Sequence, residues 1–209
     1  MDKELKANIM TISRHRICSD GGGVRTLVTF YGCPLHCEYC INDFCHNSIS
    51  NMKTTDEVLA ELLKDDLYFK ATNGGVTFGG GEPLLQSSFI KELIGKMPKH
   101  WNVCIETSLA VNFRHIEELI PYVDHWFVDT KDYHNERIYD EYTQTKGLYP
   151  LMIRNLRILK NIVGEEKITV RVPSIKGFND KTDVNLSMVV LKLNGFNNID
   201  KFEYEITNE

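Results

Sequence analysis

The chain has 209 residues, of which 42% are hydrophobic and 25% charged, a composition typical of a globular protein with a sizeable core. Its net charge of −5 argues against nucleic acid as a partner, because phosphate binding relies on clusters of lysine and arginine. No apolar run has the length of a membrane span, and no apolar region of a secretory signal follows the charged residues 1–6. We therefore expect a cytoplasmic protein without a membrane partner, whose cysteines bind metal or stay as thiols.

Strands and amphipathic helices alternate along the chain. A strand is predicted over residues 24–31, and it runs into a loop at 32–45 that contains four cysteines. Thr54 and Glu57 have capping-box spacing at the start of a predicted helix. The remaining predicted elements, in chain order, are a strand at 75–78, a helix at 89–97, a strand at 103–106, a helix around 116–120, a strand at 125–129, a helix at 152–163, a strand at 168–172, a helix at 184–193 and a strand at 202–206.

Six strands that alternate with helices predict an α/β fold with a parallel sheet covered by helices. Six strands are too few for the closed eight-stranded barrel, so an open partial (β/α)6 barrel with parallel strands fits the pattern. No linker divides the chain. We therefore expect one domain over residues 1–209.

Three cysteines of the loop, Cys33, Cys37 and Cys40, have the spacing C-x3-C-x2-C. Three soft ligands at this spacing favour an iron–sulfur cluster over zinc and leave one metal position open. On the cysteines alone, zinc or a purely structural role remains an alternative. Because the set of three is complete, we expect Cys45 not to be a ligand. Cys18 and Cys104 are predicted to be ordinary buried or half-buried thiols.

Glycine-rich or polar residues follow the predicted strands at their carboxyl ends, where parallel α/β folds build their active sites. These are Cys33 and the segments 79–83, 106–108, 129–132 and 171–173, and we expect them to converge on one rim. Each also has a structural explanation. The glycines suit a turn, and Glu106–Ser108 suits a helix cap. Asp129 and Lys131, predicted on the same side of a continuing strand, suit a surface ion pair. Arg171 suits a buried structural pair.

The cysteine spacing, with the aromatic Tyr39 before the last cysteine, resembles the signature of radical S-adenosylmethionine (SAM) enzymes. The resemblance implies that Cys33, Cys37 and Cys40 bind three irons of a [4Fe-4S] cluster, and that SAM chelates the fourth iron. It also implies a fold, the partial (β/α)6 barrel. The resemblance also assigns Tyr39 to the residues that bind the cofactors.

The resemblance extends to the other strand ends. Gly80, Gly81, Glu82 and Pro83 resemble a GGEP motif, whose backbone and glutamate hold the SAM amino group. The resemblance assigns the ribose and methionine portion of SAM to Thr107 and Ser108, further pocket positions to Asp129 and Lys131, and the SAM carboxylate to Arg171.

Longer segments resemble the activating enzymes of glycyl radical enzymes, of the pyruvate formate-lyase type. These are residues 19–26 (DGPGIRT in the family), 74–86 (GGVTFSGGEPLLQ), 129–132 and 171–180. The resemblance implies reductive cleavage of SAM to a 5′-deoxyadenosyl radical, which abstracts a hydrogen atom from a glycine of a partner enzyme. It also implies an oxygen-free setting and a reductant such as flavodoxin or ferredoxin.

The chain departs from that family in several places. Gly79 replaces a serine, Gly22 a proline and Leu109 a glycine. No cysteine-rich insertion follows Cys40, so no auxiliary ferredoxin-like domain is expected. The sequence ends after the sixth strand, so we expect the lid over the substrate to be lacking or supplied by a partner. These departures keep open a radical SAM enzyme that modifies a peptide or small molecule, and a non-catalytic iron–sulfur or zinc protein.

Overall fold

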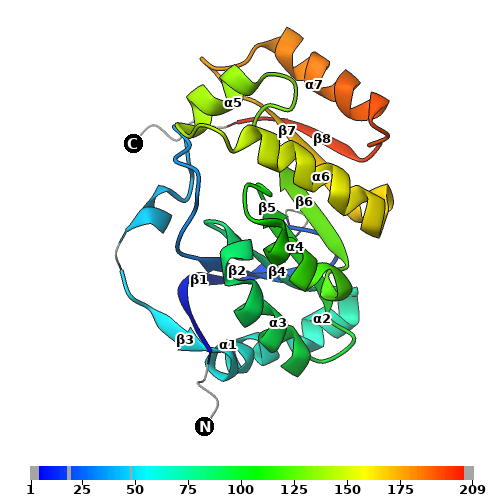
Figure 1. Ribbon diagram of the computed structural model, residues 1–209. Helices are drawn as coiled ribbons and strands as arrows, with labels where there is room; N and C mark the ends of the chain where they lie inside the picture. The colour runs from blue at the N-terminus through cyan, green and yellow to red at the C-terminus, as the bar shows by residue number, and fades with distance from the viewer. Residues whose placement is uncertain (1–4, 18–19, 48, 205–209) are drawn as a thin grey trace. The chain divides into compact units, whose positions relative to one another are not determined.

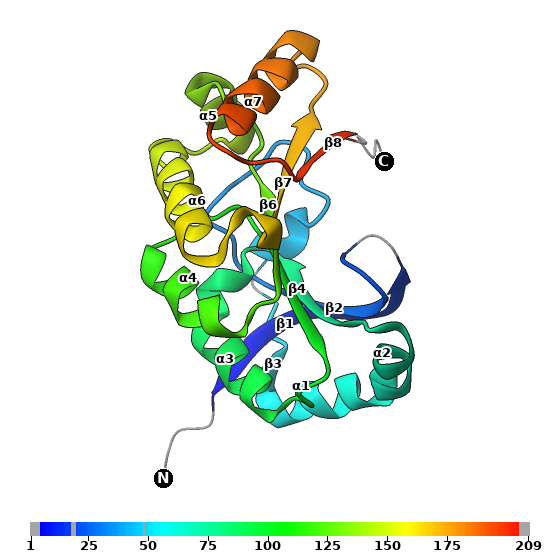
Figure 2. The same cartoon turned by 90° about the vertical axis from the view of Figure 1, so that its right-hand side faces the viewer.

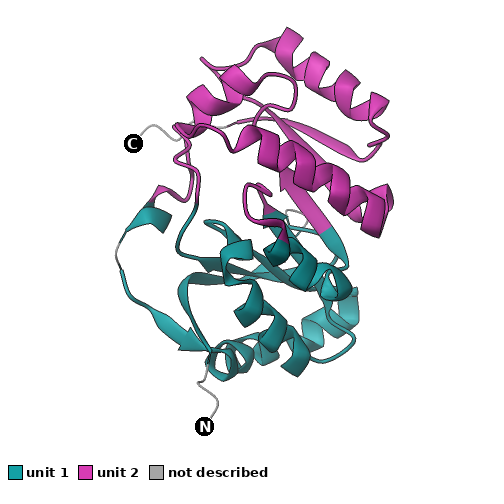
Figure 3. Ribbon diagram, viewed as in Figure 1, with its two compact units in different colours: residues 1–33, 44–106, 114–125 teal, residues 34–43, 107–113, 126–209 magenta. Residues whose placement is uncertain are grey.

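The computed structural model of the protein describes residues 5–17, 20–47 and 49–204 (Figure 1). The chain divides into two compact units (Figure 3). The first consists of residues 1–33, 44–106 and 114–125, and the second of residues 34–43, 107–113 and 126–209. The single domain over residues 1–209 therefore remains a prediction.

In the first unit, three strands run parallel: β2 (Val24–Phe30), β4 (Gly75–Gly80) and β5 (Asn102–Thr107). All three lie where the sequence predicts strands. Two further strands, β1 (Lys6–Ile17) and β3 (Met52–Thr54), extend the sheet with antiparallel pairing, β3 to β1 and β1 to β2. The sequence pattern missed β1 because its alternation of buried and exposed residues fades after the first half of the strand.

The helices of the first unit are α1 (Thr55–Leu62), α2 (Asp66–Thr72), α3 (Ser87–Lys96) and α4 (Phe113–Leu119). The predicted capping box is confirmed, because the Thr54 side chain accepts from Glu57 N–H while the Glu57 side chain accepts from Thr54 N–H. α1 buries Val58 and Leu62 completely. Short 3-10 turns lie at η1 (Asp43–His46), η2 (Leu63–Asp65), η3 (Pro83–Gln86) and η4 (Ile120–Tyr122).

The second unit has three parallel strands, β6 (His125–Asp129), β7 (Ile168–Ser174) and β8 (Ile199–Glu203). Its helices are α5 (Glu136–Thr143), α6 (Tyr149–Val163) and α7 (Lys181–Leu193), with the turn η5 (Glu165–Lys167). Figure 2 shows the three helices on one side of β7 and β8. The last strand begins three residues earlier than predicted, and residues 205 and 206 of that prediction lie outside the described residues.

The predicted α/β class is confirmed, with parallel strands and covering helices in each unit. The helices α2 and α5 were not predicted, because both are short, with seven and eight residues. α5 nevertheless buries one face, with Ile138, Tyr139 and Tyr142 at helical spacing. In the described part of the chain, no helix is both long and apolar enough to cross a membrane.

Candidate functional site

Two of the three signature cysteines lie close together in the second unit. The N–H of Cys40 donates to the Cys37 carbonyl at 3.2 Å, which closes a tight turn between them. Cys33 directly follows the β2 region of the first unit. All three are half-buried, and none of the five described cysteines forms a disulfide. Burial raises the pKa of the Cys37 thiol, and the Lys131 ammonium opposes that rise.

The end of α5 holds this loop in place. The N–H groups of His36 and Glu38 donate to the carbonyls of Thr143 and Tyr142, both at 2.9 Å. Tyr39 lies between two of the cysteines in sequence, and its ring packs against Tyr142, with ring centroids 6.2 Å apart. The same ring meets Phe178 edge-on at 5.7 Å. The loop is therefore braced by a helix and an aromatic cluster.

The donor set of the loop fits an iron–sulfur cluster. It offers three reduced thiols, which are the soft ligands that such clusters require. Within residues 5–17, 20–47 and 49–204, no three His, Cys, Asp or Glu side chains are already gathered for a metal ion. The assignment of Cys33, Cys37 and Cys40 as ligands therefore remains a prediction from their spacing.

The glycine-rich end of β4 packs against the residues before Cys33, within the first unit. Gly81 N–H donates to Phe30 O at 3.0 Å, and Glu82 N–H donates to Gly32 O at 2.7 Å. A Cβ on Gly81 would overlap the carbonyl oxygen of Gly32, so only glycine permits this approach. The ends of β2 and β4 thus meet as expected.

Glu82 is a buried carboxylate at this meeting point, with only 1% of its surface exposed. Its Oε1 accepts the N–H of Leu84 at 3.2 Å, which caps the turn η3, where Pro83 occupies the first position. Glu106 was one of the three residues explained above as a helix cap, but its side chain lies beside Gly79. A Cβ on Gly79 would lie 3.2 Å from Glu106 Oε2, so the glycine that replaces the family's serine leaves room for that carboxylate.

The ends of β6 and β7 bring together Asp129, Lys131 and Arg171 in the second unit. Asp129 and Arg171 are register partners, and Arg171 Nη1 lies 3.9 Å from Asp129 Oδ1. Lys131 Nζ lies 3.8 Å from Asp129 Oδ2. The Lys131 and Arg171 side chains are only 14% and 15% exposed and that of Asp129 is 29% exposed, so Asp129 and Lys131 do form an ion pair, but it is largely buried rather than on the surface. The Arg171 guanidinium also stacks on the Phe127 ring at 4.6 Å.

One local expectation is wrong. β6 ends at Asp129, and Lys131 has a φ of 61°, so Asp129 and Lys131 do not share a continuing strand. The left-handed turn brings the lysine back beside the aspartate. Burial alone would lower the pKa of Lys131, but the Asp129 carboxylate and the Cys37 thiol raise it well above its ordinary value. Two cations beside one carboxylate leave a net positive charge, which suits an anionic group of a ligand.

Thr107 and Ser108 lie in the turn after β5 and are 2% and 8% exposed. Their hydroxyls accept the N–H groups of Leu109 and Ala110. α4 begins only at Phe113, so these hydroxyls do not cap it. The explanation of Thr107 and Ser108 as a helix cap is therefore wrong. Leu109, which stands where the family has glycine, has a φ of 55° and is fully buried. This left-handed backbone explains why glycine suits the position.

Sequence reasoning missed two residues that support the predicted site. Asn155 on α6 is fully buried, and its Nδ2 donates to Leu109 O and Val111 O, both at 2.8 Å. A lone asparagine on the otherwise apolar face of α6, beside Met152 and Leu156, was the available signal. Tyr142 on α5 supports the cysteine loop. The sequence pattern did not indicate this residue, because it did not predict the helix α5.

The burial predicted for Cys104 is confirmed, whereas the expectation that Cys45 is not a ligand stays a prediction. Cys45 and Cys104 are each 2% exposed. Burial raises the pKa of Cys104 to about 11, which makes it a poor metal ligand and nucleophile. Cys18 lies outside the described residues.

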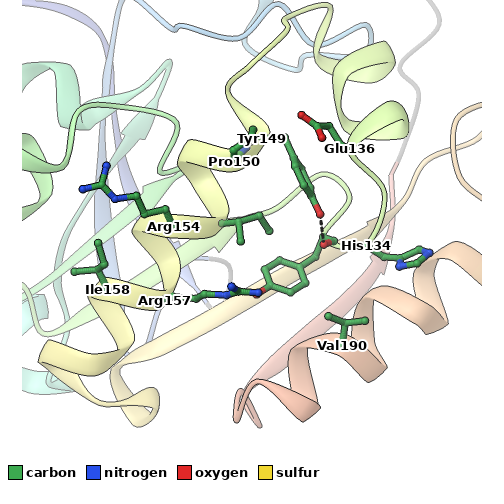
Figure 4. Close-up of a pocket in the computed structure, with 10 residues that line it drawn as sticks. His134, Glu136, Tyr149, Pro150, Arg154, Arg157, Ile158 and Val190 are labelled. Carbon is green, nitrogen blue, oxygen red and sulfur yellow. Dashed lines mark hydrogen bonds between the residues drawn. The ribbon is translucent and has the colours of Figure 1, made fainter.

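A cavity of about 590 Å³ lies among α5, α6 and α7 of the second unit (Figure 4). Tyr149, Arg154 and Arg157 of α6 line it, together with Glu136 and Val190 from the two neighbouring helices. The Tyr149 hydroxyl donates to the Tyr133 carbonyl at 2.8 Å. None of the residues predicted to bind the cluster or SAM lines this cavity.

Comparison with known proteins supports the sequence resemblance. Residues 19–146 match the family described as 4Fe-4S single cluster domain. The chain is 31% identical over 194 residues to the pyruvate formate-lyase-activating enzyme of Staphylococcus aureus strain USA300, and the match covers 88% of this chain and 74% of that protein.

Two solved structures resemble the fold. The radical SAM methyltransferase from Sphaerobacter thermophilus has a TM-score of 0.64 at 14% identity, with 97% of this chain and 68% of that chain covered. Methylornithine synthase has a TM-score of 0.58 at 14% identity, with 86% and 53% covered. At such low identities, the likeness concerns the fold alone.

Proposed function

We propose that this chain, which belongs to the 4Fe-4S single cluster domain family and to the radical SAM family of pyruvate formate-lyase-activating enzymes, installs a glycyl radical in a partner enzyme. When bound, the [4Fe-4S] cluster and SAM supply a 5′-deoxyadenosyl radical that abstracts a hydrogen atom. The hydrogen is the α-hydrogen of one glycine of the partner, and a one-electron donor such as flavodoxin or ferredoxin supplies the electron. The observation that carries the proposal is the 31% identity over 88% of the chain.

The chain's own residues bind and orient the cofactors. Cys33, Cys37 and Cys40 hold three irons through their thiolates. Glu82 is a buried carboxylate suited to the SAM ammonium group. The guanidinium of Arg171 and the ammonium of Lys131 suit the SAM carboxylate, and Asp129 keeps both cations in place.

The other predicted residues shape the SAM site. Gly80 and Gly81 let the backbone approach closely, while Pro83 begins the turn that Glu82 caps. Thr107 and Ser108 stand in a buried turn after β5, where they suit the ribose and methionine portion. Tyr39, within the cluster loop, packs against Tyr142 and Phe178 and so holds the loop in place.

SAM binding should depend strongly on Glu82 and Arg171. We expect Glu82→Ala and Arg171→Ala each to weaken SAM binding about 10- to 100-fold, because each removes a charged hydrogen-bonding group worth about 1.5–3 kcal/mol. Isothermal titration calorimetry under anaerobic conditions measures the affinity. Glu61→Ala and Arg137→Ala, at side chains 43% and 79% exposed, are matched controls and should bind SAM like the wild type. Wild-type affinity in both site variants would show that the SAM pocket is misplaced.

The partner reaction is tested with pyruvate formate-lyase as the protein substrate. After incubation with the reconstituted chain, SAM and reductant, electron paramagnetic resonance should show a carbon-centred radical on the lyase. If the lyase carries glycine deuterated at Cα, deuterium should appear in 5′-deoxyadenosine and the radical spectrum should change. The Cys37→Ala variant serves as the inactive control.

The alternatives give different outcomes in the same experiment. SAM cleavage without a protein radical would reject the activating role and favour a peptide or small-molecule substrate. Absence of SAM cleavage under strong reductant would favour a non-catalytic metal-binding protein.

A further inference from the structure

Tyr142 lies directly against the cysteine loop within the second unit. Its carbonyl accepts the N–H of Glu38, the residue after Cys37. Its ring packs against Tyr39, Phe178 and Tyr204, with centroid separations of 6.2, 5.1 and 6.1 Å. The whole residue is buried, with 0% of its surface exposed. Tyr142 is therefore the centre of an aromatic cluster that supports the loop.

The hydroxyl of Tyr142 is buried without a hydrogen-bond partner in the described part of the chain. Burial raises the pKa of Tyr142, and the neighbouring Tyr204 phenol interacts with its hydroxyl and raises it further, although the two hydroxyls lie outside full hydrogen-bond distance and angle. Lys131 and Cys37 are the other ionisable groups near this hydroxyl. A buried polar group nearly always has a hydrogen-bond partner. A buried polar group without one in a native protein indicates local strain, a catalytic or redox role, or a bound water or ion. A phenol stays protonated at neutral pH, so this hydroxyl can donate.

Other buried polar atoms also lack a partner, including Trp126 Nε1 and Tyr133 Oη. Tyr142 differs from these two by its surroundings. It touches the loop that carries Cys37 and Cys40, and it lies near the Lys131 ammonium, which can only donate and cannot accept its proton. An anionic or sulfur group beside Cys37 would be a suitable acceptor for this hydroxyl.

We propose that the Tyr142 hydroxyl donates a hydrogen bond to a sulfur of the bound [4Fe-4S] cluster on its Cys37 side and thereby raises the reduction potential. The inference rests on the proposed function, which places the cluster on Cys33, Cys37 and Cys40. A hydrogen bond to cluster or thiolate sulfur stabilises the more negative reduced form. The surrounding rings exclude water, which strengthens the hydrogen bond.

The test is the Tyr142→Phe variant, which keeps the ring and removes only the hydroxyl. We expect the reconstituted variant to bind as much iron as the wild type. Its cluster should have a more negative midpoint potential in a titration followed by electron paramagnetic resonance. SAM cleavage should be nearly unchanged with dithionite but several-fold slower with flavodoxin, because the weaker donor has less driving force. The iron-free variant should melt at the wild-type temperature or above it, since the lost hydroxyl has no partner there.

Two matched variants serve as controls. Tyr139→Phe makes the same change at a fully buried position of α5, where the ring packs against Tyr149 with centroids 5.5 Å apart. Tyr204→Phe removes the neighbouring phenol. Both should keep the wild-type potential. If Tyr204→Phe shifted the midpoint reduction potential as much as Tyr142→Phe, the inference would be overturned. The two phenols would then act together, and the effect would not come from a hydrogen bond between Tyr142 and the cluster.

The remaining outcomes are also decisive. An unchanged potential in Tyr142→Phe would reject the hydrogen bond. A lower melting temperature of the iron-free variant, or loss of iron from a variant that still folds, would assign Tyr142 a purely structural role. Failure of the proposed function would look different, since the wild type itself would then lack a four-iron cluster or leave no radical on the partner.

Discussion

Replacing Cys33, Cys37 or Cys40 with alanine should abolish the cluster. The wild-type chain, reconstituted under anaerobic conditions, should hold about four irons and four sulfides, because three thiolates and SAM complete one cubane. Each variant should hold almost none, since removing one of only three protein ligands leaves two cysteines, which are too few to hold the cluster. Iron and sulfide assays, together with the visible absorbance of the cluster, measure the loss.

The controls for this prediction are Cys45→Ala and Cys104→Ala. Both residues are 2% exposed, and the thiol of Cys104 has its pKa raised to about 11. Both variants should keep the wild-type iron content. Loss of iron in Cys45→Ala would make Cys45 a ligand and revise the set of three. Stoichiometric zinc without iron after anaerobic purification would contradict the cluster itself.

Asn155→Ala should destabilise the protein by about 2–6 kcal/mol. The change leaves the buried carbonyls of Leu109 and Val111 without their donor, and each unsatisfied group costs about 1–3 kcal/mol. For a chain of this size, the melting temperature should fall by at least about 4 °C. Differential scanning calorimetry measures the shift. Because the same amide holds the turn that follows Thr107 and Ser108, SAM binding should weaken as well.

Asn161→Ala is the matched control on the same helix. Asn161 is exposed, so its replacement should change the unfolding free energy by less than about 0.5 kcal/mol. Equal stability of Asn155→Ala and the wild type would mean that water or a shifted backbone satisfies the two carbonyls. Asn155 would then not be what positions the turn.

The strand ends of this chain illustrate how the fold serves the site. The approach of Gly81 to the carbonyl of Gly32 requires residues without a Cβ, so the glycine run is a packing requirement as well as a candidate binding motif. At Leu109, by contrast, a larger residue stands where glycine would be unstrained. Leu109 adopts a left-handed backbone conformation, and the burial of its side chain compensates for the strain.

Features that depend on residues close together along the chain follow from the amino-acid sequence alone. The strand at 125–129 and the capping box at Thr54 were predicted where the structure has them, because side-chain periodicity and cap chemistry act within a few residues. The cysteine spacing and the glycine-rich motif likewise indicated the family that the comparisons establish. Each of these motifs lies within a few consecutive residues, so it can be recognised in a single sequence.

Contacts between segments that are far apart in the sequence emerge only from the folded chain. β1 pairs with both β2 and β3, the turn at Lys131 reverses the chain, and Arg171 stacks on Phe127. Tyr142 reaches the cysteine loop from about a hundred residues away, and Asn155 reaches the turn at Leu109 from α6. Such contacts are set by which faces the packed elements bury together. Neither periodicity nor local propensity carries that information, because both describe a segment before it meets its partner.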